Sequence, residues 1–274
     1  MKKLVVFTDL DGTLLDYDSY SFEAARPALD ALRARGVPLV VCSSKTRAEI
    51  ERYRCRLENA HPFISENGGA IFIPRGYFGF PISCAPPEIV RERDYCAIVL
   101  GARYHELRRA LGELRGQGFA VRGFGDMTAE EVAETAGMSL EEARLAKQRE
   151  FDEPFVLRGS EAEADALFRA IEARGLRHTQ GRFFHIMGAS DKGMAVEILA
   201  EFFVRRDGAV VTAALGDSPN DIPMLEKVDY PIIVQKPGVG HDPRIRVRGL
   251  VKAEGVGPEG WNRAVLGLLE GGPL

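Results

Sequence analysis

The sequence predicts an α/β fold, in which a doubly wound (Rossmann-like) parallel sheet forms the core and an α+β cap domain is inserted into it. Two observations predict this fold. Continuous runs of Val, Leu and Phe alternate with amphipathic stretches at both ends of the chain, as in strands that are buried on both faces of a parallel sheet. Between these ends, strand-like and helical segments follow one another in a different order, which indicates an inserted module.

The N-terminal part of the core begins with an apolar run at residues 3–8, which predicts the first strand. An amphipathic stretch near 23–35 predicts a helix, the apolar run 37–42 predicts a second strand, and the stretch 47–57 predicts a second helix. Turn residues separate each run from the next. This order of strand, helix and strand is that of a βαβ unit, whose two strands lie parallel in one sheet.

The C-terminal part of the chain repeats the same order. It predicts a helix over 192–205, a strand over 209–215, a helix near 220–227 and a strand at 231–234. The segment that follows is rich in Gly and Pro and predicts one short helix near 261–269. Because both ends of the chain show this pattern, we expect them to form two halves of one doubly wound sheet.

The predicted cap alternates strands and helices. Thr128 and Ser139 each precede acidic residues, which predicts two helix N-caps, and the acid three positions after Ser139 completes a capping box. We therefore expect a core domain of residues 1–84 and 189–274 and a cap domain of residues 85–188. The cap strands are expected at 95–100, 119–123, 154–157 and 183–187, and the cap helices at 105–114, 129–136, 140–150 and 161–173.

The composition restricts the partners and the location of the protein. The 274 residues are 45% hydrophobic and carry a formal net charge of −4, with acidic and basic residues interleaved, so we expect no nucleic-acid partner. No apolar run approaches the roughly 20 residues that span a bilayer, and no secretory cleavage pattern is present. We therefore expect no membrane association and a cytoplasmic location. The cysteines, Cys42, Cys55, Cys84 and Cys96, lack a C-x-x-C spacing and are expected to be reduced thiols.

Two aspartates follow the first predicted strand directly. Asp9 and Asp11 stand where ligands bind in open α/β sheets, outside the carboxyl ends of the strands. Two carboxylates this close repel each other unless one is protonated or a cation lies between them. Because oxygen ligands without nearby His or Cys favour Mg²⁺ over zinc or copper, we expect a magnesium site here.

A second acidic group follows the predicted strand 209–215 and includes Asp217 and Asp221. If the two strands are neighbours, these carboxylates reach the same sheet edge as Asp9 and add ligands to the cation site. The alternative is that Asp217 or Ser218 only caps the following helix, which is common chemistry. Two acidic groups at equivalent positions favour the metal site.

Hydroxyl and lysine side chains stand beside the predicted helix starts. Ser43, Ser44 and Lys45 come directly after the second strand, where hydroxyls and backbone N–H groups bind anions. Ser190 and Lys192 open a later helix, and a lysine is a compact cation for phosphate. An aspartate beside a metal can attack phosphorus, and phosphoryl transfer needs fixed positive charge around the transferred group. The alternative is that the serines only cap helices and that the lysine is solvated.

Taken in order, four blocks resemble the haloacid dehalogenase superfamily of phosphotransferases: DLDGT at 9–13, Ser43, Lys192 and GDSPND at 216–221. The resemblance spans nearly the whole chain and implies a Mg²⁺-dependent enzyme whose cap closes over the substrate. It further implies that Asp9 is the nucleophile and that Asp11 is the general acid and base. By the same resemblance, Ser43 and Lys192 bind the phosphoryl group. The implied metal ligands are Asp9, the backbone carbonyl of Asp11 and Asp217, with support from Asp221.

Further stretches, residues 43–46, 125–132 with 142–150, and 183–188, resemble the mannosyl-3-phosphoglycerate phosphatase family. This resemblance implies hydrolysis of mannosyl-3-phosphoglycerate to mannosylglycerate and phosphate, so that the partner is a small-molecule phosphorylated sugar-glycerate. The alternatives are a broader sugar-phosphate phosphatase, a phosphomannomutase-like phosphotransferase that returns the phosphoryl group to a second position, and a non-catalytic ligand-binding protein. The complete acidic and lysine set argues against the last of these.

The rest of the substrate is expected to contact residues next to the cap. Asn67, Gly68 and Gly69 offer an amide side chain and an open backbone to sugar hydroxyls or phosphate, although they also suit a tight turn. His185 in an aromatic strand also suits a structural role. The basic run 144–149 suits a solvated face, and the family resemblance keeps a binding surface as the alternative. The expected substrate-binding residues are Ser44, Lys45, Asn67, Gly68, Gly69 and Ser190, and the unranked candidates for binding the glycerate carboxylate are Arg177, His178, Arg182, His185 and Lys45.

Overall fold

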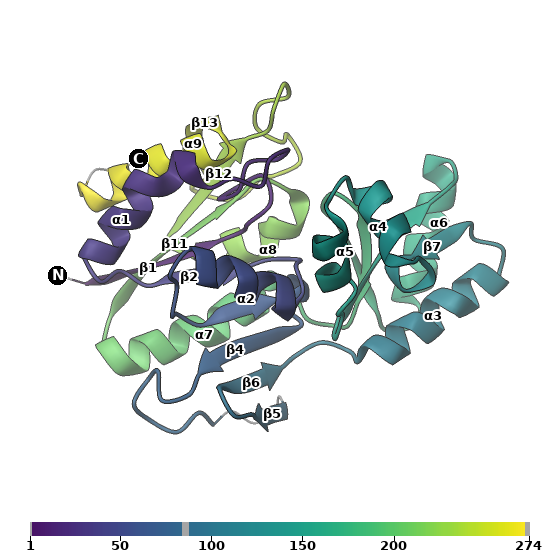
Figure 1. Ribbon diagram of the computed structural model, residues 1–274, viewed down its shortest axis with the longest axis horizontal. Coiled ribbons are helices and arrows are strands. Elements are labelled where there is room, and N and C mark those ends of the chain that lie inside the picture. The colour runs from purple at the N-terminus through teal and green to yellow at the C-terminus, as the bar shows by residue number, and fades with distance from the viewer. Residues whose placement is uncertain (1, 84–87, 272–274) are drawn as a thin grey trace.

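A computed structural model describes residues 2–83 and 88–271 of the chain. Figure 1 shows two layered parts side by side, a larger one that contains both termini and a smaller one built from the middle of the chain. Cys42, Cys55 and Cys96 are free thiols, and Cys84 lies outside the described residues. None of the helices in the described ranges is long and apolar enough to cross a bilayer.

The larger part is built on one sheet with the strand order β13-β12-β11-β1-β2-β3-β4-β6-β5. The strands from β13 to β3 pair in parallel, as predicted for the core, although β13 lies in a segment for which only a helix was predicted. The strands β4, β6 and β5 pair antiparallel. In this order the strands are β13 (Val251–Val256), β12 (Tyr230–Gln235), β11 (Val210–Gly216), β1 (Lys3–Thr8), β2 (Leu39–Cys42), β3 (Phe63–Ser65), β4 (Ala70–Pro74), β6 (Tyr95–Val99) and β5 (Glu88–Arg91).

Helices cover both faces of this sheet (Figure 1). Successive side chains of β1 are buried on opposite faces, with Val6 in one apolar layer and Val5 and Phe7 in the other. Burial on both faces explains why the strand is a continuous apolar run, and it confirms the doubly wound fold class. The residues in contact place α1 (Arg26–Ala34), α2 (Arg47–Arg56) and α9 (Gly257–Leu269) on one face, and α7 (Lys192–Asp207) and α8 (Ile222–Leu225) on the other.

The smaller part has an antiparallel sheet in the order β7-β8-β10-β9 with helices packed against it. Thr128 and Ser139 cap α4 and α5 as predicted, because each side chain accepts the N–H group of a glutamate three positions later. The elements of the smaller part are β7 (Val121–Gly123), β8 (Asp152–Leu157), β9 (Arg177–Gln180), β10 (Phe184–Met187), α3 (Tyr104–Gly116), α4 (Ala129–Ala136), α5 (Leu140–Ala146) and α6 (Glu161–Glu172). Short 3₁₀ helices in the two parts are η1 (Glu23–Ala25), η2 (Glu66–Gly68), η3 (Phe124–Asp126) and η4 (Pro219–Asp221).

The placement of the predicted strand 95–100 in the cap was wrong. The strand β6 pairs with β4 and β5, so all three belong to the large sheet. The residues of an apolar strand do not determine which sheet it joins, because its place depends on the partner strand with which it pairs. We propose that the cap begins near residue 101 instead of residue 85; residues 85–87 lie outside the described residues.

Glycines line the place where the chain passes between the two parts. The backbone carbonyl of Gly69 accepts the N–H groups of Leu100 and Gly101 at 2.9 Å each. A Cβ atom on Gly188, in the returning connection, would overlap the backbone nitrogen of Ala102. The two connections therefore approach each other more closely than a side chain at this position would allow.

We expect Gly188→Ala to lower the free energy of unfolding by about 1–3 kcal/mol, because the added methyl group must displace backbone. Gly112→Ala is the matched control, since Gly112 lies in α3 and a Cβ there meets nothing within 4 Å. The control should stabilise the protein by about 0.5–1 kcal/mol, because alanine favours helix. Chemical denaturation followed by circular dichroism measures both effects. Equal stabilities of the two variants would contradict the close approach of the two connections at Gly188.

Candidate active site

The ends of β1 and β11 bring three acidic side chains together. The two strands are parallel neighbours, and the N–H group of Asp9 donates to the carbonyl of Leu215 at 3.0 Å. Asp9, Asp217 and Asp221 are all buried, and each offers a carboxylate oxygen within 4.8 Å of the others. The acidic groups at 9–11 and 217–221 thus meet at one sheet edge, as the sequence predicted.

Helix capping does not account for Asp217. The Oδ2 atom of Asp221 accepts the N–H groups of Asp217 and Ser218 at 2.9 and 3.0 Å, so Asp221 is the residue that closes this turn. Asp217 instead accepts hydroxyl hydrogen bonds, from Thr13 at 3.3 Å and from Ser218 at 2.9 Å. Both contacts orient the Asp217 carboxylate near the neighbouring carboxylates, and neither is a helix-capping hydrogen bond.

Lys192 is buried among these carboxylates. Its Nζ atom donates to Oδ1 of Asp9 and to Oδ1 of Asp221 at 2.7 Å each, and its side chain is fully buried. Burial opposes the charged ammonium, but Asp221 and Asp9 raise the pKa of Lys192 above its ordinary value. The side chain lies at the first position of α7, where Asp191 forms the N-cap. Lys192 is therefore a fixed cation and not a solvated one.

The charges in this cluster do not balance. Burial raises the pKa of Asp9 to about 8, with Lys192 acting against this shift and Asp221, Asp217 and Asp11 adding to it. Burial, followed by the charge of Asp221, raises the pKa of Asp217 to about 6. Lys192 and, at 3.6 Å from Asp217, Lys236 are the two ammonium groups near these three carboxylates. The excess of carboxylates favours the uptake of a further cation, and their oxygen donors fit a hard divalent ion such as Mg²⁺.

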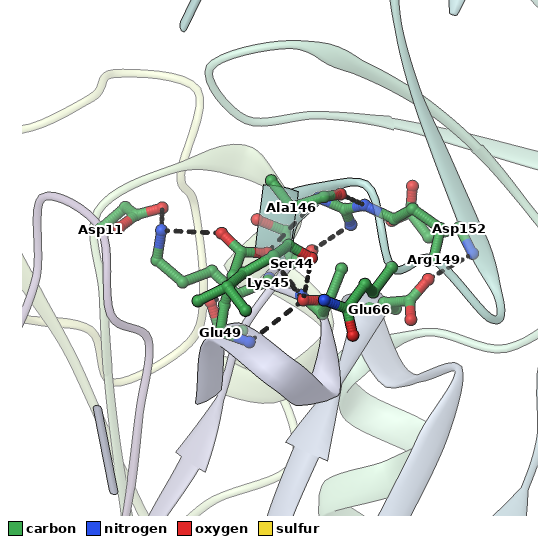
Figure 2. A network of polar contacts seen from close by, with 12 residues as sticks. Asp11, Ser44, Lys45, Glu49, Glu66, Ala146, Arg149 and Asp152 are labelled. Atoms are coloured by element: carbon green, nitrogen blue, oxygen red, sulfur yellow. Dashed lines mark hydrogen bonds and ion pairs between the residues drawn. The ribbon is translucent and has the colours of Figure 1, made fainter. Parts of the chain in front are cut away.

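Asp11 lies on the cavity side of this cluster and pairs with Lys45 (Figure 2). The distance between Asp11 Oδ2 and Lys45 Nζ is 3.0 Å, and the Asp11 side chain is 41% exposed. Lys45 also approaches Glu49 Oε1 at 3.5 Å and lies 5.1 Å from the ring centre of Tyr20. Burial opposes the charge of Lys45, but Asp11 and Glu49 raise its pKa above the ordinary value. A permanent positive charge thus faces Asp11.

The two serines after β2 are not helix caps. Thr46 caps α2, because its hydroxyl accepts the N–H group of Glu49. Ser43 is fully buried at the end of β2, and its hydroxyl accepts the N–H group of Lys45 at 3.2 Å. The carbonyl of Ser44 accepts a hydrogen bond from Arg149 Nη1 at 2.7 Å. The sequence alternative of N-cap serines is therefore excluded for both positions.

A cavity of about 330 Å³ lies between the sheet edge and the cap. The core contributes the floor, and the loops and strands of the cap contribute the opposite wall. A solute in this cavity would face the acidic cluster on one side and basic and aromatic side chains on the other. The polar lining includes Asp9, Asp11, Ser44, Lys45, Glu49, Asp217, Ser218, Asn220 and Lys236 from the core and Arg149, Arg182 and His185 from the cap.

The predicted residues Asn67, Gly68, Gly69 and Ser190 do not line this cavity. Asn67 and Ser190 line a separate, smaller cavity of about 120 Å³. A Cβ atom on Gly68, whose φ is +89°, would overlap the backbone of Asp191, so the tight packing of this turn requires glycine. The turn alternative from the sequence therefore describes Gly68 well.

Asn67 connects the core to the cap. Its Nδ2 atom donates to Asp152 Oδ2 at 2.6 Å, and its Oδ1 atom accepts from Asn220 Nδ2 at 3.1 Å. Asp152 in turn contacts Nδ1 of His185 at 2.8 Å. This buried chain of contacts links the loop of the acidic cluster to a side chain in the cavity wall. His185 is thus a hydrogen-bonded buried histidine that also lines the cavity.

Glu66 and Asp152 of this joint were missed by the sequence analysis, and Arg149 was assigned to a solvated face. The carboxylate of Glu66 accepts the N–H groups of Phe151 and Asp152 at 2.9 and 2.8 Å, and burial raises its pKa to about 8. The Arg149 side chain is only 5% exposed, so the interpretation of 144–149 as a solvated face was wrong for this residue. An acidic residue at the start of an apolar strand, as Asp152 is in β8, was the local signal that could have drawn attention to the joint.

The comparisons with known proteins agree with this geometry. A model of the haloacid dehalogenase-like hydrolases matches residues 6–78 and 145–236. A relative from Methanococcoides burtonii is 48% identical over 97% of both chains, and one from Persephonella marina is 41% identical over 97% of both. Both are named glucosyl-3-phosphoglycerate/mannosyl-3-phosphoglycerate phosphatase. A relative from Pyrococcus horikoshii, named mannosyl-3-phosphoglycerate phosphatase, is 39% identical over 84% of this chain and 90% of its own.

Solved structures share the fold at low sequence identity. The protein Thermoplasma acidophilum 0175 superposes with a TM-score of 0.67 and 17% identity, covering 96% of this chain and 97% of its own. The subclass IIB sugar phosphatase BT4131 has a TM-score of 0.63 and 15% identity, with 99% of this chain and 100% of its own covered. With a family model over more than half of the sequence and full-length relatives above 40% identity, the chain belongs to the haloacid dehalogenase-like hydrolases.

Proposed function

We propose that this chain is a Mg²⁺-dependent phosphatase that hydrolyses mannosyl-3-phosphoglycerate to mannosylglycerate and phosphate. The observation that carries the proposal is the buried cluster of Asp9, Lys192, Asp217 and Asp221, of which Asp9 and Asp217 line a capped cavity. The names of the full-length relatives support the choice of substrate. A cavity closed by a cap suits phosphoryl transfer, because it excludes bulk water around the reacting group.

In the first step, a carboxylate oxygen of Asp9 attacks the phosphorus atom. A bond forms between Asp9 and phosphorus, and the bond from phosphorus to the glycerate oxygen breaks, which leaves an aspartyl-phosphate. Lys192 restrains Asp9 through Oδ1 at 2.7 Å and supplies positive charge next to the transferred group. Asp11, in its acid form, donates a proton to the departing oxygen.

In the second step, Asp11 accepts a proton from the water that attacks the aspartyl-phosphate. The bond between Asp9 and phosphorus breaks, and phosphate leaves. The ammonium of Lys45 lies 3.0 Å from the Asp11 carboxylate and orients it in the cavity. Ser43 and Ser44 border the same region at the end of β2 and are proposed to bind phosphoryl oxygens, with Ser44 and Lys45 lining the cavity itself.

The proposed ligands of Mg²⁺ are Asp9, the backbone carbonyl of Asp11 and Asp217. Bound Mg²⁺ supplies positive charge that stabilises the phosphoryl oxygens. Asp221 supports this site indirectly, because it binds Lys192 and holds the backbone N–H groups of Asp217 and Ser218. Asn67, Gly68, Gly69 and Ser190 are proposed to position these groups from outside the cavity, through contacts such as that of Asn67 with Asn220.

A second candidate substrate is glucosyl-3-phosphoglycerate, because the names of two relatives include it. The two substrates differ only in the orientation of one sugar hydroxyl. A panel of both compounds and simple hexose phosphates, assayed for released phosphate, distinguishes the candidates. We expect a clear preference for the sugar-phosphoglycerates. Equal rates on all hexose phosphates would reduce the proposal to a broad sugar phosphatase, and isomerisation without phosphate release would identify a mutase.

We expect Asp9→Asn to lower kcat by about 10³-fold or more, because the amide is not a nucleophile. The variant should also fail to retain label when the enzyme is quenched during turnover of ³²P-labelled substrate. Asp18→Asn, at an exposed position in the loop after β1, is the matched control and should keep both activity and label. Turnover by Asp9→Asn close to that of the control would refute the role of Asp9 as nucleophile.

We expect removal of Mg²⁺ with EDTA to abolish phosphate release and added Mg²⁺ to restore it. Asp217→Asn should raise the Mg²⁺ concentration needed for half-maximal activity by about 10-fold or more, because it removes a charged ligand. Asp30→Asn, on the exposed side of α1, serves as control. A metal titration of activity measures this requirement, and identical titration curves for the two variants would contradict the proposed ligand set.

A further inference from the structure

We infer that Arg182 binds the carboxylate of the substrate's glycerate group and thereby determines the specificity of the cavity. This inference rests on the proposed function, which requires a second anionic group to be recognised apart from the phosphate. The sequence offered several basic candidates and did not rank them. Their contacts in the structure now separate Arg182 from the others.

Most basic side chains that line the cavity already have an acidic partner. Lys45 lies 3.0 Å from the carboxylate of Asp11, and Lys236 lies 3.2 Å from that of Asp242. A substrate carboxylate would have to compete with these internal ion pairs for the two ammonium groups.

Arg149 and His185 are engaged in the same way. Arg149 lies 3.9 Å from the Glu49 carboxylate and gives further donors to backbone carbonyls of Ser44 and Ala146. His185 contacts the buried carboxylate of Asp152 at 2.8 Å. Both side chains are thus held in place by contacts within the protein itself.

Arg182 differs from these four residues. Among the residues that the structure describes, no carboxylate oxygen lies within the 4.0 Å of an ion pair from its guanidinium, although it lines the cavity. Its Nη1 atom donates to the hydroxyl of Tyr20 at 3.0 Å, and its Cζ atom lies 5.6 Å from the ring centre of Tyr17. The guanidinium is therefore oriented by neutral groups, and it retains donors in the fork geometry that matches a carboxylate.

The position of Arg182 suits the glycerate end of the substrate more than the phosphate end. A line of contacts runs from Asp11 to Lys45, from Lys45 to the ring of Tyr20, and from the hydroxyl of Tyr20 to Arg182. Along this line the side chains of Lys45 and Tyr20 lie between Asp11 and Arg182. Because Arg182 lies in the turn between β9 and β10 of the cap, while Tyr20 belongs to the core, a carboxylate bound here would also join cap and core across the cavity.

The two other candidates from the β9–β10 hairpin, Arg177 and His178, do not line the main cavity. Arg177 pairs with Asp191 at 2.7 Å, and it borders only the smaller cavity. His178 approaches Glu172 at 3.3 Å and stacks on Phe168 with the ring centres 4.0 Å apart. Arg177 is therefore a suitable control, since it carries the same side chain on the same hairpin outside the main cavity.

The test compares Arg182→Gln, Arg182→Lys and the control Arg177→Gln on two substrates, mannosyl-3-phosphoglycerate and p-nitrophenyl phosphate, which has no carboxylate. Arg182→Gln should raise KM for the first substrate by about 10- to 100-fold, the effect of one lost charged hydrogen-bond pair, and leave kcat within about twofold. Arg182→Lys should recover part of the loss. All three variants should hydrolyse p-nitrophenyl phosphate at the wild-type rate.

A binding measurement separates failure of this inference from failure of the proposed function. Calorimetric titration with mannosylglycerate, which contains the carboxylate but no phosphate, should show about 10-fold or more weaker binding to Arg182→Gln than to the wild type or to Arg177→Gln. Unchanged KM and unchanged mannosylglycerate binding in Arg182→Gln would overturn the inference, as would an equal loss on both substrates. If the wild type hydrolysed neither substrate, the proposed function would fail, and the titration alone would decide the role of Arg182.

Discussion

The buried ammonium of Lys192 is the interaction on which this site depends. It donates to Asp9 and to Asp221 at 2.7 Å each, and so joins the end of β1, the start of α7 and the loop after β11. Three carboxylates at one sheet edge repel one another, and the ammonium groups of Lys192 and Lys236 compensate only part of their charge. The remaining negative charge favours a divalent cation, and a phosphoryl group needs both kinds of positive charge around it.

The joint between core and cap is the second constraint. Glu66 accepts backbone N–H groups of Phe151 and Asp152, and Asn67 bonds to Asp152 on one side and to Asn220 on the other. Glu66 and Asn67 both adopt positive φ, a conformation that costs about 1–3 kcal/mol and persists only where surrounding contacts maintain it. The contacts of Asn67 connect the cap to the loop that contains Asp217 and Asp221.

Local patterns were sufficient to predict much of this structure. Asp9 and Asp217 could be expected to meet because each follows an apolar run, and parallel neighbours end at one edge of a sheet. The caps at Thr128 and Ser139 depend on residues only three positions away. The burial of Arg149 could not be predicted, because it depends on the carbonyl of Ser44, 105 positions distant. The same reason explains why β6 was assigned to the wrong sheet, since its partner strand decided its place.

The central claim is that Asp9 receives the phosphoryl group beside a metal held by Asp217. The most direct measurement is a crystal structure of the protein with Mg²⁺ and beryllium fluoride, which imitates an aspartyl-phosphate. This account predicts that the beryllium fluoride group is attached to Asp9 within hydrogen-bond distance of Lys192 Nζ, and that Mg²⁺ contacts both Asp9 and Asp217. A beryllium fluoride group on another residue, or a metal ion remote from Asp217, would contradict this account.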